Sequence, residues 1–248
     1  MAFILETKDL TKQFGGLTAV DKTSLKLKEG GLRCILGPNG CGKTTLFNLI
    51  SGCYKPTSGK IIFAGQDISG QPVHLINRAG IGRKFQIPSV FNSMTVEENL
   101  RVPSSSNWKP SLLRSKNSVP GNRQEILTLL NLLKLTEKTN ELAGNLSHGE
   151  KQWLEIGMVM ASKPRLMLLD EPTAGMTAAE TNKTAQLIHQ ISIETGISVV
   201  VIEHDLNFVK KLASRVTVMY KGSIFREGNY EEIQEDKDVQ SIYLGRKR

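Results

Sequence analysis

The feature that most constrains the fold is a glycine-rich loop between a predicted strand and a predicted helix. Residues 37–44, Gly-Pro-Asn-Gly-Cys-Gly-Lys-Thr, match the phosphate-binding pattern GxxxxGK[ST]. The short run Arg33–Leu36 predicts a strand entering the loop, and Thr44–Ser51 predicts a helix leaving it. Glycines let backbone amides approach phosphate oxygens, and the helix adds its positive N-terminal end. The chain is therefore predicted to contain a nucleotide-binding α/β core.

Length and composition fit one large α/β domain or two small ones. The chain has 248 residues, of which 39% are hydrophobic and 23% charged. No apolar run approaches the ~18 residues that a membrane helix needs, and the N-terminus lacks a secretory pattern. Cys34, Cys41 and Cys53 have no metal-ligand spacing, which favours free thiols. These features predict a cytosolic protein whose membrane contacts are peripheral.

The net charge of +8 would suit nucleic acid, an anionic membrane face or nucleotide. Because the basic residues are scattered along the chain, the charge does not choose among these partners.

Apolar runs alternate with helical patterns, as in a parallel sheet flanked by helices. Further strands are predicted at Arg165–Asp170, Ser198–Glu203 and Arg215–Tyr220. The first thirty residues and Lys60–Phe63 predict a smaller antiparallel sheet.

The pattern turns helical between these regions. Thr95 and Glu98 form a predicted capping box, and Ile126, Leu127, Leu130 and Leu133 have the spacing of a helical core face. Residues 101–123 are rich in proline, serine and basic residues, which predicts a solvated loop or, alternatively, a contact with anionic lipid or a membrane partner. The predicted boundaries are 1–86 and 164–230 for the core and β subdomain, 87–163 for the helical subdomain and 231–248 for the tail.

Two adjacent acids follow an apolar strand. Asp170 ends that strand, where a carboxylate can bind Mg²⁺ directly or through water. Glu171 is placed to orient and polarise an attacking water. The alternative, a charge serving the next helix, is weakened because Thr177 and Glu180 already predict a cap there.

The order of these motifs resembles that of the ATP-binding cassette (ABC) ATPases over nearly the whole chain. The phosphate loop is followed by Leu146–Gln152, an LSGGQ-like segment, and then directly by the acidic strand Leu166–Glu171. The resemblance implies a P-loop NTPase (RecA-like) core with an antiparallel β subdomain and an inserted α-helical subdomain. It also implies ATP and Mg²⁺ as ligands.

The resemblance assigns further roles. His204 is implied to contact the γ-phosphate and hold the attacking water, and Gln86 to ligate Mg²⁺ and relay movement to a membrane partner. Phe14 lies where the family stacks an aromatic ring on adenine, although a core role is the alternative.

The LSGGQ-like segment implies that a second subunit takes part in each ATP site. Ser147 and Glu150 predict a capping box, so a helix should run from His148 to about Ala161. In the family this helix end, with Gly149, faces the γ-phosphate held by a second subunit; a purely structural cap is the alternative. The segment departs from LSGGQ at His148 and Glu150, and the Glu150 charge is expected to weaken the phosphate contact.

Taken together, the predicted catalytic residues are Glu171, His204 and Lys43, with Lys43 reaching the β- and γ-phosphates. The predicted metal ligands are Thr44, Gln86 and Asp170. The predicted ATP-binding residues are Phe14, Gly37, Pro38, Asn39, Gly40, Cys41, Gly42, Lys43, Thr44, Thr45, Gln86, Ser147, Gly149 and Glu150.

Several stretches look like importers of branched-chain amino acids and amides, namely Lys12–Leu17, Gly80–Arg83 and Ala174–Met176. More narrowly, residues 82–86, 146–149 with 151–157, and 243–246 are similar to the ATP-binding D subunits of urea importers. The resemblance implies a peripheral protein on the cytoplasmic face of the cell membrane, with a coupling surface at residues 88–93. Its implied partners are two transmembrane permease subunits, a second ABC ATPase subunit and, indirectly, an extracytoplasmic solute-binding protein.

Two other classes remain open. One is the ATPase of a lipid or lipopolysaccharide exporter. The other is a non-transport ATPase acting on nucleic acid or ribosomes, which the basic charge would suit. Such proteins usually carry tandem cassettes or a long coiled coil, and this sequence shows neither, so no nucleic-acid partner is expected.

Overall fold

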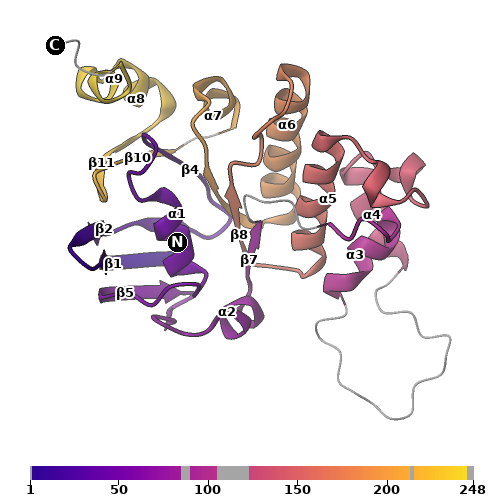
Figure 1. Ribbon diagram of the computed structural model, residues 1–248, viewed down its shortest axis with the longest axis horizontal. Helices are drawn as coiled ribbons and strands as arrows, with labels where there is room; N and C mark the ends of the chain where they lie inside the picture. Colours follow the sequence, from indigo (N-terminus) through magenta and orange to yellow (C-terminus); the bar gives the residue numbers. More distant parts are fainter. Residues whose placement is uncertain (1, 85–89, 105–122, 213–214, 245–248) are drawn as a thin grey trace.

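The larger sheet has six strands in the order β11-β10-β4-β9-β8-β7 (Figure 1). The computed structural model describes residues 2–84, 90–104, 123–212 and 215–244. Five of the strands are parallel, and only β11 runs antiparallel to its neighbour, β10. The strand bounds are β4 (Leu32–Leu36), β7 (Ile81–Lys84), β8 (Leu166–Asp170), β9 (Ser198–Ile202), β10 (Val216–Tyr220) and β11 (Ser223–Gly228).

The smaller sheet is antiparallel and comes from the first seventy residues. Its order is β2-β1-β5-β6, and β3 also pairs with β1. The predicted fold class is confirmed by these two sheets. The bounds are β1 (Phe3–Phe14), β2 (Leu17–Thr23), β3 (Lys26–Lys28), β5 (Ser58–Phe63) and β6 (Gln66–Asp67).

Alternation along the buried strands divides the core into two clusters. In β8, Leu166 and Leu168 join the cluster that contains helix α1 and the antiparallel sheet, whereas Met167 and Leu169 join the cluster on the opposite face. The next residue in this alternation, Asp170, therefore lies on the α1 side. The helices of the core are α1 (Lys43–Ile50), α2 (Val73–Ala79), α6 (Ala178–Thr195) and α7 (Leu206–Leu212), followed by α8 (Tyr230–Glu235) and α9 (Lys237–Leu244).

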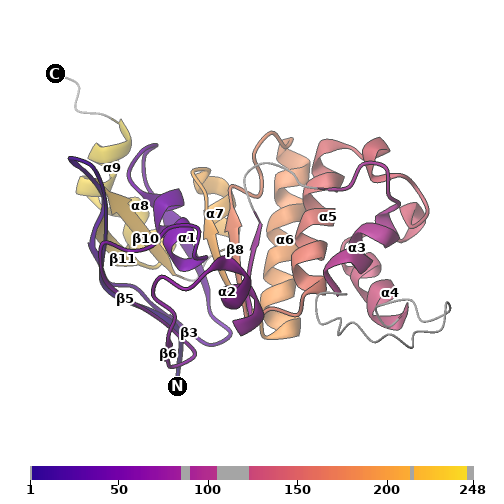
Figure 2. The same cartoon turned by 60° about the horizontal axis from the view of Figure 1, so that its bottom comes forward.

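A group of helices covers the edge of the molecule farthest from the antiparallel sheet (Figure 2). These are α3 (Val96–Ser104), α4 (Arg123–Leu132) and α5 (His148–Ala161), with 3-10 turns at Thr136–Lys138 and Ala143–Asn145. The capping box predicted at Thr95 is present, since the Thr95 and Glu98 side chains accept from each other's backbone amides.

Two predictions in this region are wrong in detail. Ile126, Leu130 and Leu133 are buried, but Leu127 is 40% exposed because it lies outside the face of α4 that contacts α5. The predicted loop 101–123 is also too long at both ends, since α3 continues to Ser104 and α4 begins at Arg123. The rest of that segment, 105–122, lies outside the described residues.

Within the part of the chain that the structure describes, no helix is both long enough and apolar enough to cross a bilayer.

Candidate active site

The phosphate loop joins β4 to α1, and close backbone packing explains its first and third glycines. A Cβ at Gly37 would lie 2.3 Å from the Met219 carbonyl oxygen, and one at Gly42 would lie 2.2 Å from that of Ala19. Both glycines also have positive φ, 152° and 106°. At Gly40, by contrast, no described atom lies within 4 Å of an added Cβ. The loop is therefore pinned at both ends and open at Gly40, where a phosphate could approach its amides.

Lys43 begins α1 and turns its side chain back into the loop. Its Nζ donates to the carbonyl oxygens of Gly37 (2.7 Å) and Pro38 (3.0 Å), and the residue is only 6% exposed. The ammonium thus lies inside the curve of the loop, with two loop carbonyl oxygens as its acceptors. Thr44 and Thr45, the next two residues of α1, are exposed and half-buried.

Asp170 ends β8 and has one oxygen without a protein partner. Arg83 Nη2 donates to Oδ2 at 3.2 Å, whereas Oδ1 is buried and accepts no hydrogen bond from any described group. Burial raises the pKa of Asp170, and the Arg83 guanidinium opposes that rise. Buried acceptors are rarely unsatisfied in native structures. Oδ1 is therefore suited to bind Mg²⁺, either directly or through a water, which is the role that the sequence predicted for Asp170.

Glu171 follows Asp170 in a strained backbone conformation. Its φ is 45°, an uncommon value for a residue with a side chain, and its amide donates to the Ile202 carbonyl oxygen at 3.0 Å. Because β8 and β9 are neighbours, the residues after the two strands meet. His204 Nδ1 lies 3.8 Å from Glu171 Oε1. The predicted catalytic acid and histidine are thus brought together at the carboxyl edge of the sheet.

Glu203 was not predicted as part of the site, yet it holds the loop after Glu171. Its carboxylate accepts from the Thr173 amide (3.1 Å) and hydroxyl (2.6 Å), and from the His204 amide (3.2 Å). Burial raises the pKa of Glu203, and the bonds from Thr173 oppose the rise. The sequence gives no signal of this contact, because residues 173 and 203 are far apart along the chain. They meet because β8 and β9 are neighbours in the sheet.

The N-terminus of α5 has the predicted capping box. The Ser147 hydroxyl accepts from the Glu150 amide (3.3 Å), and Glu150 accepts from the Ser147 amide (2.9 Å). Lys138 Nζ lies 2.9 Å from Glu150. Burial by itself would raise the pKa of Glu150, but the bonds from Ser147 and Lys138 outweigh burial and lower it. The Glu150 charge is therefore largely compensated within this chain.

His148, the other residue that departs from LSGGQ, contacts the loop between β8 and α6. His148 Nε2 lies 2.8 Å from the Ala174 carbonyl oxygen, so its ring reaches the loop that precedes α6. A Cβ at Gly149 would lie 2.5 Å from Glu180 Oε1. A side chain at 149 would therefore have to displace the Glu180 carboxylate at the start of α6.

Phe14 is 42% exposed, which rules out the alternative of a core residue. Its ring meets that of Tyr54 edge-on, with centroids 5.3 Å apart, and Lys12 Nζ lies 5.0 Å from its centroid. The ring is available for stacking at the end of β1. Gln86 lies outside the described residues, as do residues 88 and 89 of the predicted coupling surface; Val90 is half-buried and Phe91 is 46% exposed.

Cys41 lies within the phosphate loop and is buried, with 4% of its surface exposed. Burial raises its pKa, although Lys43 opposes the rise. Tyr243 of α9 approaches the same place: burial and, less strongly, the charge of Cys41 raise the pKa of Tyr243 to about 12, and the Gly37 backbone opposes that rise. The C-terminal helix thus contacts the phosphate loop, a link the sequence did not predict.

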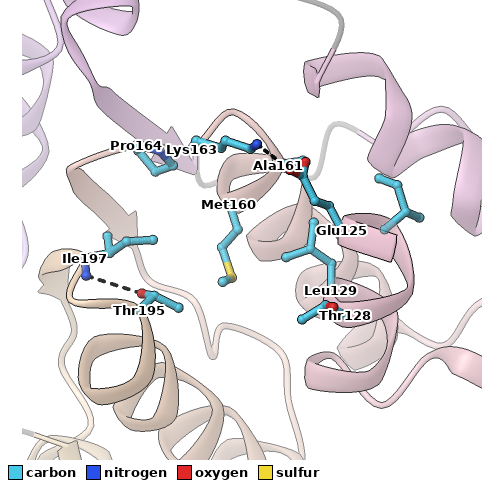
Figure 3. Close-up of a pocket in the computed structure, with 10 residues that line it drawn as sticks. Glu125, Thr128, Leu129, Met160, Ala161, Lys163, Pro164, Thr195 and Ile197 are labelled. Carbon is cyan, nitrogen blue, oxygen red and sulfur yellow. Dashed lines mark hydrogen bonds and ion pairs between the residues drawn. The ribbon is translucent and has the colours of Figure 1, made fainter. Parts of the chain in front are cut away.

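A cavity of about 420 Å³ lies elsewhere, between α4, α5 and the turn from α6 into β9 (Figure 3). Leu129 and Met160 face it, and the Lys163–Glu125 ion pair (2.7 Å) lies at its side. None of the predicted site residues lines this cavity, so it is not the nucleotide site.

A phosphate loop, an unpaired buried carboxylate oxygen and an acid–histidine pair meet at one edge of a parallel sheet. This combination of fold and site defines a P-loop ATPase.

Comparison with known proteins shows to which family of P-loop ATPases the chain belongs. Residues 20–174 match the ABC transporter family. The chain is 37% identical to the high-affinity branched-chain amino acid transport ATP-binding protein BraF of Pseudomonas aeruginosa over 249 residues, covering 98% of each chain. It is 35% identical to LivG of Escherichia coli, the protein of the same description, with the same coverage. The chain therefore belongs to the ABC transporter family and is an ATPase of its branched-chain amino acid importer group.

Solved structures agree with this assignment. The ADP conformation of an ATP-binding cassette of an ABC transporter has a TM-score of 0.87 at 31% identity, covering 99% of this chain and 100% of that one. A dimeric cassette in a post-hydrolysis state, bound to ADP and Pi, has a TM-score of 0.77 at 26% identity, covering 91% and 98%.

Proposed function

We propose that this chain hydrolyses Mg²⁺-ATP as one of a pair of ATPase subunits and so powers an importer of urea or of related small amides and branched-chain amino acids. The observation that carries the proposal is the meeting of the phosphate loop, Asp170 and Glu171 at one sheet edge, in a chain whose relatives are transport ATP-binding proteins.

Opposite charges account for the way in which the site would bind ATP. ATP brings about four negative charges, and the loop amides, the α1 N-terminus and Lys43 are positioned to offset them. Thr44 and Asp170 would hold Mg²⁺ together with Gln86. The bound ion supplies additional stabilisation of the charge that develops on phosphoryl transfer. Phe14 would stack on the adenine ring.

Glu171 would accept a proton from the attacking water, and His204 would hold that water in line with the γ-phosphate. General-base assistance of this kind is typically worth about 10²–10⁴-fold in rate. The strained φ of Glu171 and the Glu203 contacts to the following loop support the proposal, because they fix the backbone from which the carboxylate extends.

A second ATPase subunit would complete each site. The α5 N-terminus, with Ser147 and Gly149, would face the γ-phosphate held by the partner chain. The dimeric cassette structure supports this arrangement, and Lys138 supports it by placing a cation 2.9 Å from the Glu150 carboxylate.

Transport would follow from the closing and opening of the pair. The proposed partners are two transmembrane permease subunits on the cytoplasmic face of the membrane and, indirectly, a solute-binding protein. Exposed Phe91 supports a coupling surface within residues 88–93. Named relatives favour branched-chain amino acids as solutes, whereas the motif resemblance at residues 82–86, 146–149 with 151–157, and 243–246 favours urea.

The solute is tested by uptake. Cells lacking the gene are compared with cells carrying it or its Lys43→Ala variant, using labelled urea and labelled leucine. Loss of urea uptake that only the unaltered gene restores is the expected result. Loss of leucine uptake alone would replace urea with an amino acid, and unchanged uptake of both would contradict the proposed importer role.

A further inference from the structure

We propose that Arg83 is a positioning residue for the metal site: it fixes the carboxylate of Asp170 so that Oδ1 is presented to the divalent cation. This inference rests on the proposed assignment of Asp170 to Mg²⁺. Neither the motifs nor the relatives' names assign a role to Arg83.

Arg83 is buried in a network that joins two parts of the site. It lies on β7, paired with Leu168 of β8, and its side chain is 5% exposed. Nη1 donates to Asn48 Oδ1 (2.7 Å) and Ser51 Oγ (2.8 Å), at the end of α1. Nη2 donates to Asp170 Oδ2 at 3.2 Å. One planar group thus connects the helix that begins at the phosphate loop with the carboxylate at the end of β8.

The network gives the two carboxylate oxygens of Asp170 different surroundings. Oδ2 of Asp170 is held by the guanidinium, while Oδ1 is buried without a partner among the described residues. A guanidinium has a rigid fork of donors, and the bonds to Asn48 and Ser51 keep that fork from turning. The carboxylate plane is therefore fixed, and the cation site gains a ligand that needs no reorientation when the ion binds.

Two other roles for Arg83 predict different results. A residue that only neutralised Asp170 would oppose the cation, so its removal would strengthen cation binding. A residue that only stabilised the fold would behave like Arg33, another buried arginine of the same sheet. Arg33 donates to Thr217 Oγ1 (2.8 Å) and pairs with Glu227, at the end of β4 farthest from the phosphate loop. Arg33 is thus a matched control.

The experiment measures Mn²⁺ binding to the full chain by electron paramagnetic resonance, in the presence of a non-hydrolysable ATP analogue. Arg83→Met should weaken Mn²⁺ affinity about 10–100-fold, the usual cost of losing a residue that orients a metal ligand. Arg33→Met should change it less than about threefold, because it lies outside that shell. Affinity for the analogue in EDTA should be similar in both variants. Arg83→Lys should recover only part of the affinity, because a single ammonium cannot span the three acceptors.

A milder variant covers the case in which Arg83→Met does not fold. Asn48→Ala leaves the ion pair in place and removes one anchor of the guanidinium, so it should weaken Mn²⁺ binding to a smaller extent than Arg83→Met. Equal effects of the Arg83 and Arg33 variants, no effect of the Asn48 and Arg83→Lys variants, or tighter binding on loss of Arg83 would each overturn the inference.

Asp170→Asn separates this inference from the proposed function. Weaker Mn²⁺ binding in Asp170→Asn with normal binding in the Arg83 variants would overturn only the role of Arg83. Normal binding in Asp170→Asn would overturn the metal assignment itself, and the inference with it.

Discussion

At the scale of single residues, the site depends on side chains whose directions are fixed by their neighbours. Glu171 has a left-handed backbone conformation, and the turn after it is held by Glu203 through Thr173. Strain of this kind persists only where the surrounding structure enforces it. The backbone conformation of Glu171 is therefore set by two adjacent strands rather than by the local sequence.

Replacing Glu171 with glutamine should lower the rate of hydrolysis about 10²–10⁴-fold, because the amide cannot accept a proton from the attacking water. ATP affinity should change little, since the phosphate loop is intact. Single-turnover hydrolysis and fluorescent-nucleotide binding measure the two quantities, with Glu125→Gln, at a half-buried acid outside the site, as control. Turnover close to that of the unaltered protein would contradict the proposed role of Glu171.

The cysteines should differ in reactivity. Cys53 is exposed, whereas Cys41 is buried and burial raises its pKa, so little thiolate is available there near neutral pH. Iodoacetamide should label Cys53 first and Cys41 much more slowly, as measured by mass spectrometry over time. Protein eventually modified at Cys41 should fail to bind ATP. Equal labelling rates, or full ATP affinity after modification of Cys41, would contradict this account.

At the scale of elements, β7 joins the core to the helical subdomain through two consecutive side chains. Because side chains alternate along a strand, Arg83 lies on the α1 side and Lys84 on the α5 side. Lys84 Nζ is 3.4 Å from Glu155 Oε2, and both side chains are buried. Burial lowers the pKa of Lys84, and Glu155 opposes that change. Strand β7 thus contacts both the Asp170 carboxylate and the helix that begins within the LSGGQ-like segment.

Removing one charge of this pair should be costly, whereas removing both should not. Lys84→Met should destabilise the fold by about 3–5 kcal/mol, since Glu155 would face the core without the lysine. The double variant Lys84→Met/Glu155→Met should recover most of that loss, because both desolvation costs disappear. Denaturant unfolding measures the cycle. Simple additivity of the two single variants would show that the pair is not coupled.

Local signals explain which elements could be predicted from sequence. The capping boxes at Thr95, Ser147 and Thr177 depend on residues three apart, and all three are present. Burial of Leu127 was predicted wrongly because helical spacing allows several faces, and only packing selects one. The Arg83–Asp170 contact could not be predicted, because it requires β7 to lie beside β8, a pairing that the motifs do not encode.

At the scale of the whole molecule, the phosphate loop and helix α5 lie in different parts of the fold. The loop lies near the antiparallel sheet, and α5 lies with the helical group at the other edge (Figure 2). A helix N-terminus that serves ATP bound to the same loop would need to cross this separation. A second chain placed head to tail would instead supply it directly.

The most direct test of that claim is ATP turnover per subunit. We expect the isolated chain, diluted until sedimentation shows only monomer, to hydrolyse ATP far more slowly than the same chain assembled with its second ATPase subunit and permeases. Gly149→Asp in one subunit should depress turnover at the site whose phosphate loop belongs to the other. A monomer that turns over ATP as fast as the assembled complex would contradict the proposal that two chains build each site.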